Sequence, residues 1–246
     1  MRIRLTARRA PLLAIGAAVL MTAAPGALHA KDSPETHPPG PAAKLYPVPV
    51  DIHLDYATVP DMKDWAEHSR LIAVAWYPVI ARILDSPGYT PPSKFNLTYK
   101  EMDGIAYTGG EGIVCAAKWF REHPGDYGAV VHEVAHVVQS YPKYDPVWLV
   151  EGIADYVRWF NYEPPAVRPV PNPDKAKYTD SYQTTGGFLA WVQKNRDSDI
   201  VYRLNAALRK GEYSPDLWKV KSGKSVDELW AEYIATVPKA APKPQK

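Results

Sequence analysis

The residues best suited to chemistry are two histidines and a glutamate, His132, Glu133 and His136, which form a His-Glu-x-x-His motif inside the apolar segment 130–139. In an α-helix, residues four apart lie on the same face, so both imidazoles point to one spot. Imidazole nitrogens are common zinc ligands, and Glu133 lies off their line, where it can act as general base on a metal-bound water. The pattern predicts a catalytic Zn²⁺ site, and the alternative is two histidines hydrogen bonded inside a buried helix.

A catalytic zinc site needs a third protein ligand, and the next predicted helix offers Glu151 and Asp155. At 1.5 Å of rise per residue, about five residues of helix separate His136 from the turn, and about five more lead from the second helix start to Glu151. If the two helices pair antiparallel, Glu151 returns to the level of His136, and Asp155 returns to the level of His132. We therefore predict Glu151 as the third ligand.

Asp155 is predicted to accept a hydrogen bond that orients His132, as carboxylates commonly do behind ligating histidines. The spacing leaves the converse open, with Asp155 as the ligand. It also leaves open a surface position for Glu151 and an ion pair of Asp155 with Arg158, three residues further on.

The elements that must position these residues are predicted as strands first and helices later. A helix is expected from Met62 to about Leu84, with a kink at Pro78. The residues expected on its inward face are Trp65, Leu71, Ile72, Val74, Ala75 and Ile80. This order predicts an α+β fold, with a small N-terminal sheet and its helices followed by a mostly helical C-terminal lobe. Alternating or apolar segments predict strands at 48–56, 94–100, 104–108 and 112–115.

The zinc-binding helix is expected to begin after Asp126, a favourable N-cap residue. A Pro-rich loop is expected at 162–179. The single cysteine, Cys115, excludes an intrachain disulfide and is expected to be a small buried apolar residue. Further helices are expected at about 180–195, 199–209, 214–219 and 225–235.

The first thirty residues have the plan of a secretory signal peptide. Four arginines among the first nine residues precede the apolar segment 11–21, and small residues follow up to Ala30. The apolar segment is shorter than the roughly 20 residues of a membrane-spanning helix. We expect cleavage near Ala30 and an exported protein, periplasmic or secreted, without a membrane anchor. A retained N-terminal anchor is the alternative, and the pair Arg8-Arg9 leaves twin-arginine export open.

The formal charge changes sign when this signal is removed. The whole chain has 29 Lys+Arg against 27 Asp+Glu, a net charge of +2, and four of the arginines lie in residues 1–30, which contain no acid. Without them the net charge is −2, which argues against a nucleic-acid-binding protein. Pro-rich composition predicts a disordered leader at 31–46 and a disordered tail at 238–246, around one domain at 47–237 that we expect to be monomeric.

Four segments of the chain together resemble the plant basic secretory protein family and its bacterial relatives. They are Gly104-Ile-Ala-Tyr-Thr-Gly-Gly110, Val131–Gln139 around the motif, Trp148–Arg158 with its Glu-Gly-Ile-Ala-Asp-Tyr sequence, and Tyr182–Leu189. The resemblance covers roughly residues 46–236. The chain departs from the family in its slightly acidic mature charge and in Gly186-Gly187, where bulkier residues are usual.

The resemblance implies a zincin-like metallopeptidase fold of the gluzincin type, with the ligand Glu151 on the second helix. In such peptidases the substrate backbone pairs with an edge strand, which assigns substrate binding to Gly104, Ile105, Ala106 and Tyr107. An ordinary inner strand is the alternative.

Tyr182 is our candidate to hydrogen bond the oxyanion that forms during peptide hydrolysis, and the alternative is a packing tyrosine.

The sequence therefore predicts an exported zinc-dependent peptidase that acts on peptide or protein substrates through a zinc-activated water, with Glu133 as general base. Two other functions use the same residues. One is a non-catalytic zinc protein that binds cell-wall or glycan material, and the other is a zinc hydrolase of non-peptide amides or esters.

Overall fold

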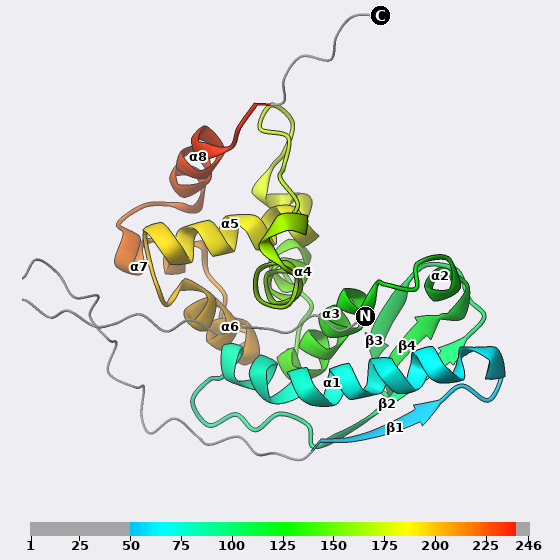
Figure 1. The fold of residues 1–246 in the computed structure, drawn as a ribbon. Helices are drawn as coiled ribbons and strands as arrows, with labels where there is room; N and C mark the ends of the chain where they lie inside the picture. Colours follow the sequence, from blue (N-terminus) through cyan, green and yellow to red (C-terminus); the bar gives the residue numbers. More distant parts are fainter. Residues whose placement is uncertain (1–49, 240–246) are drawn as a thin grey trace, which may run out of the picture. The chain divides into compact units, whose positions relative to one another are not determined.

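The computed structural model describes residues 50–239, which form an α+β fold around a small mixed sheet (Figure 1). The α+β class predicted from the sequence is confirmed. Four strands lie in the order β1-β2-β4-β3. They are β1 (Asp51–Asp55), β2 (Lys94–Lys100), β3 (Ala106–Gly109) and β4 (Gly112–Ala116).

The edge strand β3 is the one antiparallel member of this sheet. β1 pairs parallel with β2, and β2 pairs parallel with β4. β3 pairs antiparallel with β4, so that Ala106 lies opposite Cys115. The strand predicted at 104–108 is displaced in the structure, because Gly104 has a positive φ of 90° and lies with Ile105 before the strand begins. Strand β2 has the predicted bounds.

One face of the sheet is buried under two helices, α1 (Lys63–Ile83) and α3 (Tyr127–Gln139). Helix α1 contacts β1, α3 contacts β3 and β4, and the two helices pack against each other. Alternate strand residues point into this core, and Cys115 is buried as predicted. The buried strand residues include Ile52, Phe95, Leu97, Tyr99, Ile113 and Cys115.

The inward face of α1 agrees with the predicted one only in part, since Ile80 is fully buried as predicted but Leu71, Val74 and Ala75 are exposed. Leu71 is 58% exposed and Val74 is 37% exposed, so both lie on the outer side of the helix. The buried side combines three alanines and Ser69 with the large side chains of Tyr77 and Ile80, and the Ser69 hydroxyl there is 2.7 Å from the Tyr99 hydroxyl. Apolar character alone therefore does not mark the buried face of this helix, because alanines and Ser69 share that face with Tyr77 and Ile80 while some larger apolar residues lie outside.

The helices after the sheet pack around α4, which lies between α3 and α5 (Figure 1). α4 continues into a π-helical segment, Arg158–Tyr162, and the predicted Pro-rich loop follows with two short 3-10 turns. The helix expected at 214–219 is a 3-10 turn, Pro215–Trp218, that leads into a short helix. The remaining helices are α2 (Ala117–Glu122), α4 (Val147–Val157), α5 (Tyr182–Asn195), α6 (Ile200–Lys210), α7 (Lys219–Ser222) and α8 (Val226–Thr236).

The contact between α4 and α5 depends on glycine. A Cβ atom on Gly186 would lie 2.9 to 3.2 Å from backbone atoms of Asp155 and Tyr156. A Cβ atom on Gly152 would lie 2.2 Å from Thr185 Cγ2. The absence of a side chain at position 186 thus lets α5 touch the backbone of α4 beside Asp155.

The predicted signal peptide, the leader at 31–46 and residues 240–246 of the predicted tail lie outside the described residues. Between residues 50 and 239, no helix combines the length and the apolar character needed to span a membrane.

Replacement of Gly186 by alanine should destabilise the fold by about 1–3 kcal/mol, because the added methyl group meets backbone that cannot rotate away. Urea unfolding of the purified domain measures this change. Gly125→Ala is the matched control, since nothing lies within 4 Å of its Cβ position and its φ is not positive. Equal stability of the two variants would contradict the close-packing argument.

Candidate metal centre

Helix α3, which carries the motif, is held at both ends and buried along its length. The Asp126 side chain accepts a hydrogen bond from the Ala129 N–H at 3.3 Å, as predicted for an N-cap. Ser140 ends the helix in a left-handed conformation, with φ of 41°, and its N–H donates to the His136 carbonyl. Almost every residue between these ends is buried, so the helix crosses the core and presents its histidines to a fixed place.

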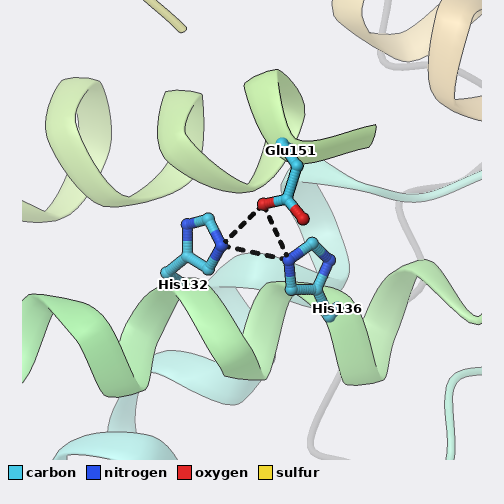
Figure 2. A group of neighbouring side chains, drawn as sticks. All are labelled: His132, His136 and Glu151. Carbon is cyan, nitrogen blue, oxygen red and sulfur yellow. Dashed lines mark hydrogen bonds and ion pairs between the residues drawn. The ribbon is translucent and has the colours of Figure 1, made fainter. Parts of the chain in front are cut away.

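The structure brings both histidines of α3 and one glutamate of α4 to a common point (Figure 2). The Nε2 atoms of His132 and His136 are 3.0 Å apart. Glu151 Oε2 lies 3.2 Å from the first of these atoms and 3.5 Å from the second. Each of the three residues offers one ligand atom, and these atoms lie within 4.8 Å of one another. A metal ion could therefore be held by two imidazoles and one carboxylate.

The other nitrogen of each imidazole is fixed by a separate partner. His132 Nδ1 is 2.6 Å from Asp155 Oδ1, the contact that the antiparallel register predicts. His136 Nδ1 is 2.7 Å from Gln139 Oε1, and the amide Nε2 of Gln139 donates to the Val150 carbonyl at 2.9 Å. Because both acceptors favour a proton on Nδ1, the Nε2 atom of each ring faces the common point and supplies its lone pair to a metal ion when the ring is neutral. This donor set fits a divalent cation such as zinc.

The charges of the centre also favour a cation. Burial alone lowers the pKa of His132, but hydrogen bonds with Asp155 and Glu151 outweigh it and raise that pKa to about 10. Burial raises the pKa of Glu151, but hydrogen bonds from the two histidines outweigh it and hold this pKa well below its usual range. Without metal, a proton on His132 thus balances the carboxylates. A metal ion must displace this proton, since ligating histidines are neutral.

Glu133 lies on the side of α3 that faces the edge strand β3. The Thr108 hydroxyl lies 2.7 Å from Glu133 Oε2 and 3.1 Å from the Glu133 carbonyl oxygen, so it donates to either. Glu133 is only 7% exposed, and its carboxylate lines the same cleft as the two histidines.

Two tyrosines flank the centre, one beside each histidine. The Tyr182 ring lies 6.1 Å from the His132 ring and is 53% exposed. Its backbone has φ of 47° and follows Ser181, with φ of 66° and ψ of −172°, so two adjacent residues adopt conformations costly for side chains other than glycine. The Tyr144 ring lies 5.8 Å from the His136 ring, and its hydroxyl donates to Glu151 Oε1.

The edge strand presents backbone groups to the cleft at alternate positions. The Ala116 N–H donates to the Ile105 carbonyl at 2.8 Å. Hydrogen-bonded positions alternate in an antiparallel pair, so Tyr107, opposite Val114, is the next residue that bonds to β4. The outward N–H and C=O groups are consequently those of Ala106 and Thr108.

Of the four residues assigned to substrate binding, Ala106 alone thus has strand backbone groups free for pairing. Gly104 precedes the strand and does not line the cleft, whereas Ile105 and Tyr107 line it with side chains 39% and 47% exposed.

The centre opens into a cleft of about 940 Å³ between α3, α4 and the edge strand. The exposed aromatic side chains at its border are those of Tyr107, Tyr144 and Tyr182. The three candidate ligands and these exposed tyrosines therefore line one cleft.

Sequence reasoning missed three residues of this centre. Gln139 stands three residues after His136 on the same helix face, a spacing that could have indicated it. Thr108 follows Ala106 by two in a strand, so alternation could have placed it on the same face. Nothing in the sequence indicates Tyr144, because it lies in the loop between α3 and α4. In a loop, residue spacing does not predict which side chains come into contact.

Comparison with known proteins identifies one family. The model of the BSP family, described as "Peptidase of plants and bacteria", matches residues 66–233, which is more than half of the chain. No curated protein and no solved structure matches the chain.

The two acids of α4 should differ in their effect on bound metal. Glu151→Ala should abolish stoichiometric zinc, because only two ligand atoms remain. Asp155→Ala should keep the metal with affinity lowered by about 10- to 100-fold, the usual cost of losing an acceptor behind a ligating histidine. Metal analysis and chelator competition measure both effects, with the exposed Glu122→Ala as control. Retention of zinc by Glu151→Ala, with its loss from Asp155→Ala, would reverse the assignment.

Proposed function

This chain belongs to the BSP family, the peptidases of plants and bacteria, and from that premise we propose that it is an exported zinc-dependent peptidase. The observation that carries the proposal is the convergence of His132 Nε2, His136 Nε2 and Glu151 Oε2 beside the carboxylate of Glu133. Family membership accounts for peptidase activity in general. The choice of zinc rests on this donor set.

The arrangement is better suited to catalysis than to a structural metal. Structural zinc sites are closed by four protein ligands, whereas catalytic sites use three and leave one position open. Among residues 50–239, the cluster around these histidines offers three ligand atoms, and Glu151 supplies the third. All three residues line the cleft. This favours hydrolysis over the non-catalytic alternative. We also propose a zincin-like fold, since an antiparallel edge strand borders the helix that carries the motif.

Zinc, when held by these three side chains, supplies a Lewis acid that makes water more acidic and polarises a carbonyl group. Glu133 acts as general base: its carboxylate takes a proton from the attacking water and passes it to the leaving amine. Thr108 fixes one carboxylate oxygen, Oε2, and among the described residues no hydrogen bond engages Oε1. Oε1 is therefore the oxygen available for the water.

The peptide is held by the edge strand and by Tyr182. Ala106 and Thr108 offer outward backbone N–H and C=O groups, so an extended peptide can add to the sheet beside β3. The phenol of Tyr182 is half-exposed, and no hydrogen bond within residues 50–239 involves its hydroxyl. It can donate to the oxyanion that develops on the peptide carbonyl. The strained backbone at 181–182 supports a functional role for this placement.

Glu133→Gln should keep bound zinc and lose hydrolysis. The amide cannot accept the proton of the attacking water, so cleavage should fall by about 100- to 10,000-fold, the usual contribution of a general base. The measurement is digestion of unfolded casein by the mature protein, together with zinc analysis of the same sample. A chelator should abolish the wild-type activity, and added zinc should restore it.

Full cleavage by Glu133→Gln would exclude the proposed role of this carboxylate. If the zinc-loaded wild type cleaves no peptide but hydrolyses simple esters or amides, the centre is a non-peptide hydrolase.

We further propose that residues 1–30 are removed during export and that the mature chain is periplasmic or secreted, with a domain from residue 47 to 237. Intact-mass measurement of the exported protein from a bacterial host should then give a chain that begins near Lys31. Recovery of a chain beginning at Met1 in the membrane fraction would indicate a retained anchor.

A further inference from the structure

We propose that Tyr144 is a positioning residue that holds Glu151 to one-oxygen coordination and so keeps a position on the metal open for water. The inference rests on the proposed function, because it concerns how the metal would be held. The Tyr144 hydroxyl donates to Glu151 Oε1, while Oε2 faces both histidines at 3.2 and 3.5 Å. The two oxygens of one carboxylate are thus assigned to different partners.

Tyr144 reaches this carboxylate from the connection between the two helices that carry the ligands. The connection runs from Ser140 to Pro146, between the end of α3 and the start of α4. The Tyr144 ring lies 5.8 Å from the His136 ring at an interplanar angle of 49°, so it borders the centre beside His136. The side chain is half-exposed, which leaves room for a change at the hydroxyl without disturbance of the core.

The two tyrosines at the centre differ in what their hydroxyl groups contact. The hydroxyl of Tyr144 is bound to a ligand carboxylate, whereas that of Tyr182 has no hydrogen bond within the described part of the chain. Tyr182 is therefore available to substrate. Tyr144 acts on Glu151 and, through it, on the number of ligand atoms.

A carboxylate can bind a metal through one oxygen or through both. If Oε1 of Glu151 also turned to the metal, it would add a fourth protein ligand atom and crowd the position that water needs in a catalytic site with three protein ligands. The turn requires loss of the hydrogen bond from Tyr144, and bonds to an ionised acceptor are about twice as strong as neutral ones. The phenol thus favours the one-oxygen arrangement.

The test uses cobalt(II) as the probe metal in the mature protein. Four-coordinate cobalt absorbs visible light more strongly than five-coordinate cobalt, so the spectrum reports the number of ligand atoms. We expect Tyr144→Phe to fold normally and bind cobalt with a weaker visible spectrum than the wild type. X-ray absorption of the zinc-loaded variant should show one more short metal–oxygen distance. Tyr182→Phe is the matched control and should keep the wild-type spectrum.

The outcomes separate this inference from the proposed function. A wild-type protein that binds cobalt and a Tyr144→Phe variant with an identical spectrum would overturn the role of Tyr144 alone. A wild-type protein that binds neither cobalt nor zinc would overturn the metal centre, and with it this inference. The same spectral change in Tyr182→Phe would assign the effect to the general polarity of the cleft and overturn the specific role of Tyr144.

Discussion

The register between α3 and α4 is the constraint on which the centre depends, because the ligands come from both helices. A shift of one helical turn would place Asp155 beside His136 and remove Glu151 from both imidazoles. The hydrogen bond from Gln139 to the Val150 carbonyl joins the two helices one residue before Glu151, so it fixes this register at the ligand itself. The glycine contact of α5 with the backbone beside Asp155 holds α4 from its other side.

This register also satisfies polar groups that are costly to bury. His132, Glu151 and Asp155 are each at least nine-tenths buried among apolar side chains, where an unpaired charge would be strongly destabilising. Each of the three has hydrogen-bond partners within the group. The group therefore tolerates burial with a proton on His132, and a metal ion can replace that proton with little movement of the side chains.

The sequence predicted the positions of the candidate ligands more accurately than it predicted which side chains are buried. The His-Glu-x-x-His spacing and simple helix lengths placed Glu151 and Asp155 at the correct levels, because helical rise is nearly constant. The inward face of α1 was correct at Ile80 and wrong at Leu71 and Val74, because alanines and Ser69 take part of the buried face and hydrophobicity alone does not select them. The strand expected from residue 104 begins at Ala106, because Gly104 turns the chain before pairing starts. The contact of Tyr144 with Glu151 could not be predicted, because residue spacing in a loop does not indicate where a side chain lies.

Thr108 joins the two functions that the proposed reaction needs, substrate pairing and proton transfer. Its backbone groups face outward from β3, and its hydroxyl bonds to Glu133 on α3. A peptide that pairs with β3 at Thr108 therefore lies at a fixed offset from the base, and displacement of the strand would move both together. The metal ligands, in contrast, are fixed by α3 and α4 and do not depend on β3. In the proposed reaction, one pair of helices would thus hold the metal, and a single threonine on the sheet edge would set the peptide against it.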